Sequence, residues 1–230
     1  MSLDYTLYYW PIPFRGHIPR FVLAEAGAAW DEPGFDEMLA LKEADPLDQP
    51  TPFMGPPLLH HHASDTWLSQ MPAITMALGR RHGLCHDPDL DLRLACDASD
   101  VLLEITNSHG AQMWDPDDWA AFRADRLPRW MRMHDRIAAE AGDGWLSGTD
   151  APGLADLTLG ALWHTMTDRL PPLRADLDAH APALAELADR VAARPAIADL
   201  RARWDDSPWR YCGGQIEASI LDMLERDDRQ

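Results

Sequence analysis

The stretch Gly55–Gly83 reads GPPLLHHHASDTWLSQMPAITMALGRRHG, and the order of its residue types decides the fold of the first third of the chain. Pro56 and Pro57 have no N–H to offer to a strand ladder, so they predict a forced turn, suited to a cis X–Pro bond, at the entrance to a strand. Leu58–Leu59 and Trp67–Leu68 then predict two short strands joined by a polar turn.

The residues after Gln70 predict a helix. Pro72 suits the first helical turn, where its missing N–H loses no hydrogen bond, and Gly83 suits the residue after the last turn. A proline turn, two strands and a helix therefore follow one another, and we expect the free amides of the helix's first turn to lie beside the proline turn. Such an amide cluster attracts a carboxylate.

This order of elements resembles the half of the thioredoxin-like domain that holds glutathione in the glutathione transferases. The resemblance implies that the loop at Pro56 and Pro57 pairs its backbone with the cysteine of glutathione, and that Gln70 and Met71 take its γ-glutamyl group. Met71 stands where the family has Ser, and Pro56 has no N–H, so two of the family's donors are missing. Met71 keeps its backbone N–H and Pro56 its carbonyl, so we expect a weakened site.

Length and composition exclude several classes of protein. A chain of 230 residues with 46% hydrophobic residues and 10 Trp can bury a real core. Its net charge of -18 argues against nucleic-acid binding, which needs clustered Lys and Arg. No apolar run approaches the roughly 18 residues of a membrane helix, and no leader pattern opens the chain. The 3 Cys show no zinc spacing. We expect a cytoplasmic protein with reduced thiols and no metal, membrane or nucleic-acid partner.

An aromatic-rich strand, Tyr5–Trp10, is expected at the start of the chain, with Tyr9 on the same face as Tyr5. A turn at Arg15–Gly16 follows, and Pro19 is expected to open a helix that stops at Gly27. The end of such a strand lies at the carboxyl edge of the sheet, where open α/β sheets bind ligands.

Tyr9-Trp10-Pro11 with Arg15-Gly16 after it resembles the opening segment of the tyrosine-type glutathione transferases, with a short insertion at Pro13-Phe14. The resemblance implies that Tyr9 is the catalytic residue, which donates a hydrogen bond to the glutathione sulfur, and that Arg15 contacts glutathione. A thiol with a pKa of about 8.5 is mostly protonated at neutral pH, and a hydroxyl donor near positive charge favours the nucleophilic thiolate.

Other interpretations of these aromatic residues stay open. Tyr9 is either the sulfur contact or a strand residue packed in the core, and Tyr8 is its rival but points to the opposite face. Trp10 either lines the electrophile pocket, with Phe14, or packs in the core. No Cys follows the first strand, which disfavours disulfide exchange.

The segment from Ala28 to Met54 has a poor pattern, in which Trp30 and Phe35–Leu41 are expected to contain a second strand and Leu39–Ala44 a short helical turn. Lys42 is its only cation. By resemblance Lys42 holds the glycine carboxylate of glutathione, and the alternative is a solvated lysine. His60–His62 predicts a solvated turn, because adjacent side chains point in different directions and do not converge on one metal ion.

Asp87-Pro88, a cap followed by a first-turn proline, opens a region that is helical in period throughout. Asp97, Asp100 and Glu104 lie on neighbouring faces of its first helix. They form either a solvated acidic face or, by resemblance, a site in which Asp100 reaches across a dimer to the neighbour's glutathione.

Further helix signals follow. Asp115-Pro116 is expected to open a long helix bent at Pro128, and Asp156 is expected to cap a buried helix that starts at Gly153. The tail helix, Gln215–Leu224, lies either over the pocket as a lid or on the outside of the helical bundle.

The sequence therefore predicts an α/β domain at residues 1–84 and an all-helical domain at residues 88–230. The resemblance implies that the first is a thioredoxin-like domain and that the second contributes the electrophile pocket. The resemblance, over Tyr5–Trp204, implies a homodimeric detoxification enzyme that conjugates glutathione to small hydrophobic electrophiles or reduces peroxides. The alternative is a non-catalytic relative that kept the scaffold as a binding or interaction protein. A third interpretation is a domain that binds a different small anion at the amides beside Met71.

Overall fold

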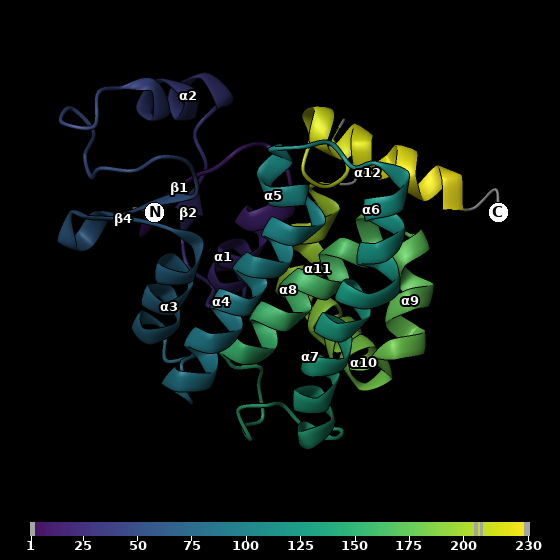
Figure 1. Ribbon diagram of the computed structural model, residues 1–230. Coiled ribbons are helices and arrows are strands. Elements are labelled where there is room, and N and C mark those ends of the chain that lie inside the picture. Colours follow the sequence, from purple (N-terminus) through teal and green to yellow (C-terminus); the bar gives the residue numbers. More distant parts are fainter. Residues whose placement is uncertain (1–2, 205–206, 208, 228–230) are drawn as a thin grey trace.

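Four short strands form a mixed sheet at the N-terminal side of the molecule (Figure 1): β1 (Tyr5–Tyr8), β2 (Trp30–Asp31), β3 (Leu58–His61) and β4 (Thr66–Ser69). Their order is β2-β1-β3-β4, with β1 parallel to β2 and the other pairs antiparallel. The computed structural model describes residues 3–204, 207 and 209–227. The bond between Pro56 and Pro57 is cis and directly precedes β3, as predicted.

Alternation along β1 separates two hydrophobic clusters. Tyr5, Leu7 and Tyr9 belong to the large core that runs through most of the molecule, whereas Tyr8 packs with Met38 in a small cluster. The prediction that Tyr9 and Tyr8 face opposite ways is therefore confirmed.

Three helices complete this half: α1 (Phe14–Glu25), α2 (Phe35–Glu43) and α3 (Met71–Arg81). α3 begins where the proline signal predicted. Pro19, however, lies inside α1 and does not open it. α1 starts earlier because Phe14, Ile18 and Phe21 bury one face in the core, which offsets the helical hydrogen bond that Pro19 lacks. The second strand is limited to β2, at Trp30, and residues 35–41 fold as part of α2, not as a strand. The short helical turn expected at Leu39–Ala44 lies almost entirely in α2.

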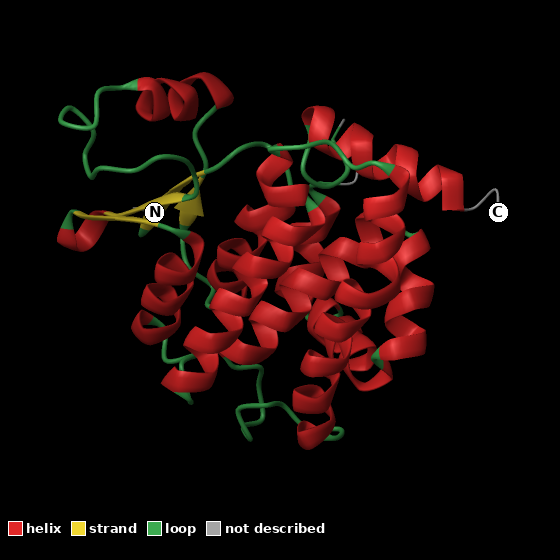
Figure 2. Cartoon of the chain, viewed as in Figure 1, coloured by secondary structure: helices red, strands yellow, loops and turns green. Residues whose placement is uncertain are grey.

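Helices make up the rest of the described chain (Figure 2). They are α4 (Pro88–Ile105), α5 (Asn107–Gly110), α6 (Pro116–Ala121), α7 (Leu127–Ala141), α8 (Leu154–Arg169), α9 (Pro172–His180), α10 (Pro182–Ala192), α11 (Pro195–Ala202) and α12 (Gly214–Asp227). Asp87 caps α4 by accepting from the amides of Asp89 and Leu90. A π-helical turn, Phe122–Arg126, joins α6 to α7 directly before Pro128, where a bend is expected. No described helix is long and apolar enough to cross a membrane.

α8 is the most buried helix, and Asp156 ties its first turn to the preceding loop. One carboxylate oxygen accepts from the amide of Gly153 (2.9 Å) and the other from the amide of Leu146 (2.8 Å). The side chain is fully buried, and burial raises the pKa of this carboxyl. Its predicted role as a cap is confirmed.

Asp156→Ala should lower the free energy of unfolding by about 3 kcal/mol, because a buried acceptor is lost and the buried amide of Gly153 and the half-buried amide of Leu146 are left without partners. Urea unfolding followed by circular dichroism measures this loss. Asp150→Ala, in the exposed part of the same loop, is the matched control and should change stability by less than about 0.5 kcal/mol. Equal effects of the two changes would contradict the capping role.

Candidate functional site

A cavity of about 640 Å³ opens between the sheet half and the helical half of the molecule. Its volume lies within the range of roughly 300–1,000 Å³ that small-molecule sites occupy. Nine of the ten residues expected at the site line it: Tyr9, Trp10, Phe14, Arg15, Lys42, Pro56, Pro57, Gln70 and Met71. The tenth, Asp100, is exposed on α4 and does not line the cavity. Its expected contact is with glutathione on a neighbouring subunit, so that role and the homodimer stay predictions.

Tyr9 follows β1 directly and is 3% exposed. Its hydroxyl oxygen accepts a hydrogen bond from the backbone N–H of Arg15 at 3.1 Å. The ring packs against Gly16 so closely that a Cβ there would collide with it. Burial raises the pKa of Tyr9 far above its usual value, although the charges of Arg15 and Arg20 oppose this rise. Tyr9 therefore keeps its proton, which leaves its hydroxyl able to donate one hydrogen bond.

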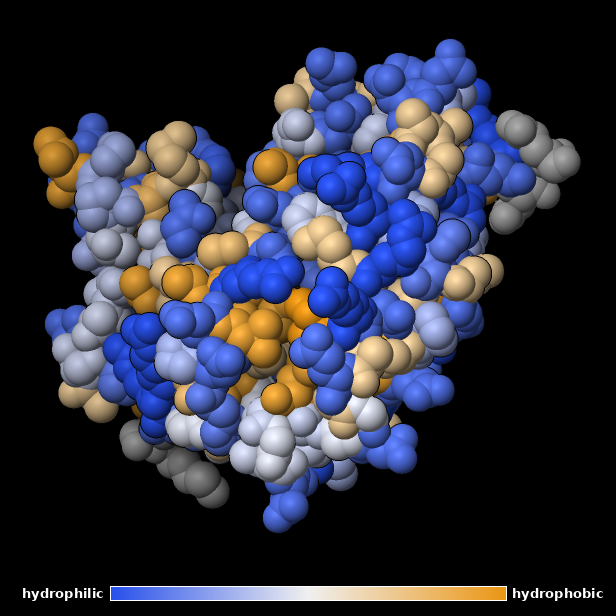
Figure 3. Space-filling view, turned by 60° about the horizontal axis from the view of Figure 1, so that its bottom comes forward, coloured by the Kyte–Doolittle hydropathy of each residue, from blue (hydrophilic) through white to orange (hydrophobic). Residues whose placement is uncertain are grey.

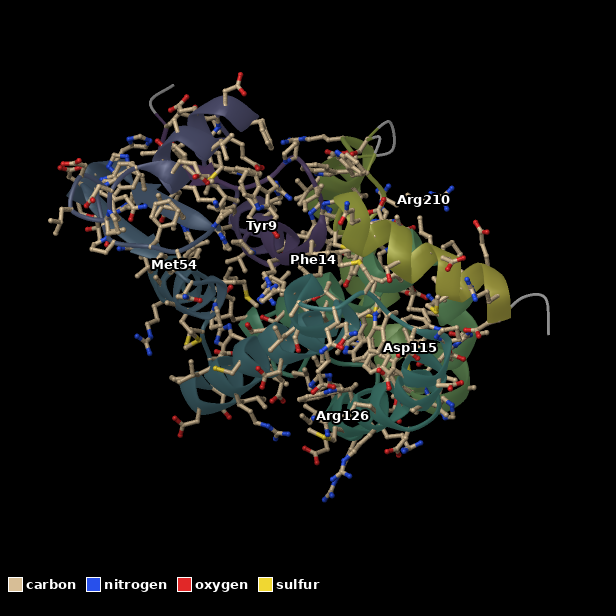
Figure 4. The ribbon with its side chains drawn as sticks, turned by 45° about the horizontal axis from the view of Figure 1, so that its top comes forward. Tyr9, Phe14, Met54, Asp115, Arg126 and Arg210 are labelled. Carbon is tan, nitrogen blue, oxygen red and sulfur yellow. The ribbon has the colours of Figure 1, made fainter. Side chains whose placement is uncertain are left out.

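Two aromatic side chains flank the position of Tyr9. Phe14 is buried, and Figure 4 shows it near Tyr9 in the middle of the molecule, between the sheet half and α12. Trp10 is half-buried and packs against the ring of Phe35, with 5.5 Å between centroids. Trp10 thus lines the cavity and also packs with a neighbour, and its part in an electrophile pocket stays a prediction.

The stretch that decides the fold lies beside Tyr9, because β1 and β3 are paired with Tyr8 opposite Leu58, and it supplies the rest of the sheet-side wall. Gln70 precedes α3 with φ 73°, a left-handed conformation that is costly for a residue other than glycine and that often occurs at ligand sites. Met71 is 2% exposed and starts α3, so its backbone amide lies at the helix N-terminus. Lys42 reaches the cavity from α2 and forms an ion pair with Glu43. Pro56 and Pro57 complete this wall.

The helical wall contains residues for which the sequence offered no signal. Ser99 and Thr106 come from α4 and its end, His109 from α5, and Cys212 and Ile216 from the start of α12 and the loop before it. Ile216, in the first turn of α12, thus borders the cavity, whereas Ile220, Met223 and Leu224 pack in the core. The role of the tail as a lid stays a prediction. Burial raises the pKa of the Cys212 thiol to about 12, which makes it a poor nucleophile.

His109 reaches the cavity because α5 is a left-handed turn. Its residues, Asn107, Ser108, His109 and Gly110, have φ values of 46°, 59°, 59° and 71°. Only glycine adopts this region without strain, and three of the four are not glycine. Gly110 is needed for a second reason, since a Cβ there would collide with Ile216.

Arg15 joins three elements at the cavity. Its guanidinium donates to the hydroxyl of Ser99 (3.0 Å) and to Nε2 of His109 (3.1 Å), while its backbone N–H binds Tyr9. We call Arg15, Ser99 and His109 the Arg15 cluster. Burial lowers the pKa of Arg15 from its usual value. The side chain of Arg15 therefore faces the helical wall and not the wall of Gln70 and Met71.

Two other features of the described chain lie outside this candidate site. His60, His61 and His62 bind Asp65, Ser64 and Thr6, respectively, and the described residues contain no group of three ligands suited to a metal ion. A larger cavity of about 850 Å³ lies between α4, α7 and the loop at 144–149 and contains no expected site residue. Figure 3 views the molecule from that side, where an apolar patch is bordered by hydrophilic residues.

Comparisons with known proteins agree with this architecture. Residues 90–223 match a family model described as glutathione S-transferase, C-terminal domain. No curated protein matches the sequence. The fold is similar to the pi-class glutathione S-transferase of Onchocerca volvulus, at 18% identity, TM-score 0.73, covering 93% of this chain and 99% of that one.

Two further solved structures are similar. One is a glutathione transferase of Phanerochaete chrysosporium in complex with oxidised glutathione, at 16% identity and TM-score 0.71, covering 88% of this chain and 96% of that one. The other is a monomeric glutathione S-transferase of the hookworm Necator americanus, at 19% identity and TM-score 0.67, covering 90% and 100%. At these identities the likeness shows the fold: a sheet-containing N-terminal region followed by a helical region.

Proposed function

Because this chain belongs to the glutathione S-transferase family, we propose that it binds glutathione in the cavity at Tyr9 and conjugates its sulfur to small electrophiles. One observation carries the proposal: a buried tyrosine hydroxyl, the cis-proline turn and the first amides of α3 border the same cavity. A dimer and a role in cytoplasmic detoxification belong to the same proposal.

Different residues on the sheet side of the cavity would bind different parts of glutathione. The backbone N–H of Met71 and the side chain of Gln70 would take the γ-glutamyl group, with the helix N-terminus favouring its carboxylate. The carbonyl of Pro56 accepts from the cysteine amide, and Lys42 pairs with the glycine carboxylate. These contacts leave the sulfur at Tyr9.

Tyr9 stabilises the thiolate by donating a hydrogen bond from its hydroxyl group to the sulfur, while the proton stays on the phenol. The amide of Arg15 holds the phenol oxygen, so that the hydroxyl does not need to reorganise when charge develops. The charges of Arg15 and Arg20 act on Tyr9 and favour an anion beside it. In the reaction the thiol proton leaves to solvent, the S–C bond forms, and the bond from carbon to its leaving group breaks.

Glutathione at one hundred times its dissociation constant should raise the free energy of unfolding by about 2.7 kcal/mol, because it binds the folded state alone. Thermal unfolding across a millimolar glutathione series, together with retention on immobilised glutathione, measures this. Gln70→Ala should weaken binding about tenfold through a lost hydrogen bond, and the exposed Gln112→Ala is the control.

A second candidate is a non-catalytic binding protein on the same scaffold. It is favoured by the two missing donors, Met71 in place of Ser and Pro56 without an N–H. Glutathione binding without conjugation of any aryl halide would support this candidate. No retention and no thermal stabilisation by millimolar glutathione would contradict glutathione binding in either form.

A further inference from the structure

The Arg15 cluster holds a positive charge that has no counter-ion. Nothing in the described part of the chain places a carboxylate within ion-pair distance of Arg15, and its two side-chain partners, Ser99 and His109, are neutral groups. Its Nε is buried without any hydrogen-bond partner. The nearest acidic influence is that of Asp100, which is exposed. A half-buried guanidinium without an anion is costly, which marks a place where an anion binds.

The charges of the residues that line the cavity differ from those of the protein as a whole. The protein has 38 Asp and Glu against 20 Lys and Arg, yet no Asp or Glu occurs among the described residues that line the cavity. The charged residues of this lining are Arg15 of α1 and Lys42 of α2, and Lys42 is already paired with Glu43. The positive charge of Arg15 therefore favours a negatively charged ligand on its side of the cavity.

The three members of the cluster have hydrogen-bond donors to spare. Because Arg15 donates to Nε2 of His109, the neutral imidazole carries its proton on Nδ1. Burial and the charge of Arg15 lower the pKa of His109, which keeps the ring neutral at pH 7. The hydroxyl of Ser99 accepts from Arg15, so its own proton is free to be donated. Together the cluster offers N–H and O–H donors around one cation, the chemistry that binds a carboxylate.

The position of the Arg15 cluster indicates that the anion it binds belongs to the electrophile and not to glutathione. Glutathione, under the proposed function, lies along Lys42, Pro56 and Gln70, on the sheet side. The guanidinium of Arg15 turns the other way, toward α4 and α5, and is linked to the reaction point through its own backbone N–H to Tyr9. The left-handed turn that presents His109 is a strained feature of the kind that accompanies ligand contacts.

We propose that the Arg15 cluster binds a carboxylate carried by the electrophile, so that the preferred second substrates are small aromatic acids bearing a leaving group. This inference rests on the proposed function. With 4-chloro-3-nitrobenzoate, the thiolate attacks the carbon that bears chlorine, the S–C bond forms, chloride leaves with the C–Cl electron pair, and the thiol proton goes to solvent. The carboxylate stays unchanged and serves only for binding.

The test compares 4-chloro-3-nitrobenzoate with its methyl ester, which lacks the charge. Each kcat/KM is divided by the rate constant of the uncatalysed reaction with glutathione, because the two compounds differ in intrinsic reactivity. We expect the wild-type protein to prefer the acid by about tenfold or more, as charge-assisted hydrogen bonds imply. Arg15→Met should abolish this preference, chiefly through the KM of the acid. Arg132→Met, an exposed arginine of α7, is the matched control and should retain it.

His109 is tested by two variants. His109→Gln keeps both an acceptor for Arg15 and an N–H donor, so it should retain most of the preference for the acid. His109→Leu removes both and should reduce the preference severalfold. Equal losses in the two variants, or no loss in either, would contradict the role of the imidazole in the cluster.

Binding without chemistry separates this inference from the proposed function. Calorimetry with 4-methyl-3-nitrobenzoate, which has no leaving group, and with its methyl ester reports the carboxylate contact even if no conjugation occurs. Tighter binding of the acid, lost in Arg15→Met, supports the cluster. Equal binding of acid and ester, or a preference for the acid that survives in Arg15→Met, overturns it. Conjugation of the ester without any preference for the acid overturns this inference and leaves the proposed function standing.

Discussion

Tyr9→Phe should lower kcat with 1-chloro-2,4-dinitrobenzene by about a hundredfold, because the thiolate of glutathione loses one preorganised hydrogen-bond donor. Its effect on glutathione affinity should be small, because the phenol contacts only the sulfur. The pH dependence should also move. The donor stabilises the thiolate and lowers the pKa of the bound thiol, so without it the acid limb of kcat/KM shifts toward the free thiol value of about 8.5.

Tyr8→Phe is the matched control for this change. Tyr8 lies next to Tyr9 in the chain but faces the small cluster with Met38, and its ring packs against Trp67 with 5.5 Å between centroids. Removal of its hydroxyl should leave both kcat and the pH profile unchanged. Steady-state kinetics from pH 5 to pH 9, with glutathione affinity measured separately, decides the matter. Unchanged turnover in Tyr9→Phe would remove Tyr9 from the mechanism.

Arg20→Met should lower the free energy of unfolding by about 3–5 kcal/mol, because it breaks a buried ion pair and leaves its partners without donors. Arg20 is fully buried in α1. It donates to both carboxylate oxygens of Glu32 and to the carbonyl oxygens of Trp10 (3.2 Å), Ile12 (2.7 Å) and Pro13 (3.3 Å). These carbonyls belong to the loop between Tyr9 and α1, so the change should also disturb the geometry of the cavity at Tyr9.

Urea unfolding measures the effect, with Arg93→Met as the control. Arg93 is exposed and pairs with Asp97 at 3.5 Å on the surface of α4, a class of ion pair that contributes about 0–1 kcal/mol. Removal of the partner carboxylate in Arg20→Met/Glu32→Leu should recover part of the loss, because no unpaired buried charge then remains. A loss below about 1 kcal/mol in Arg20→Met would show that the loop is held by packing alone.

The sheet-side wall of the cavity could be predicted from the sequence because its parts are local. The prolines before β3, the start of α3 at Met71 and the alternation that places Tyr9 opposite Tyr8 each depend on residues a few positions apart. Two local predictions were wrong. Pro19 lies within α1, because burial of this helix in the core offsets the hydrogen bond that the proline lacks. Residues 35–41, where a strand was expected, belong to α2, in which Met38 alone is buried and most residues have high helix propensity.

Arg20 shows the limit of such reasoning. In the sequence it is one arginine in a helix, and nothing near it indicates that it is fully buried or that it binds three carbonyl groups of the preceding loop. Glu32, its charged partner, lies beyond the end of α1 and meets it only when β2 joins the sheet.

The sequence by itself determined the proline turn, the strand faces, the capped helix starts and the family resemblance, since each is encoded in short-range spacing and backbone chemistry. The tertiary structure alone decided the helical wall. Arg15 and His109 are 94 positions apart, and they meet because α5 turns left-handed under Ile216 of α12. The physical reason is that such contacts depend on how distant helices pack, and this information is distributed over the whole core.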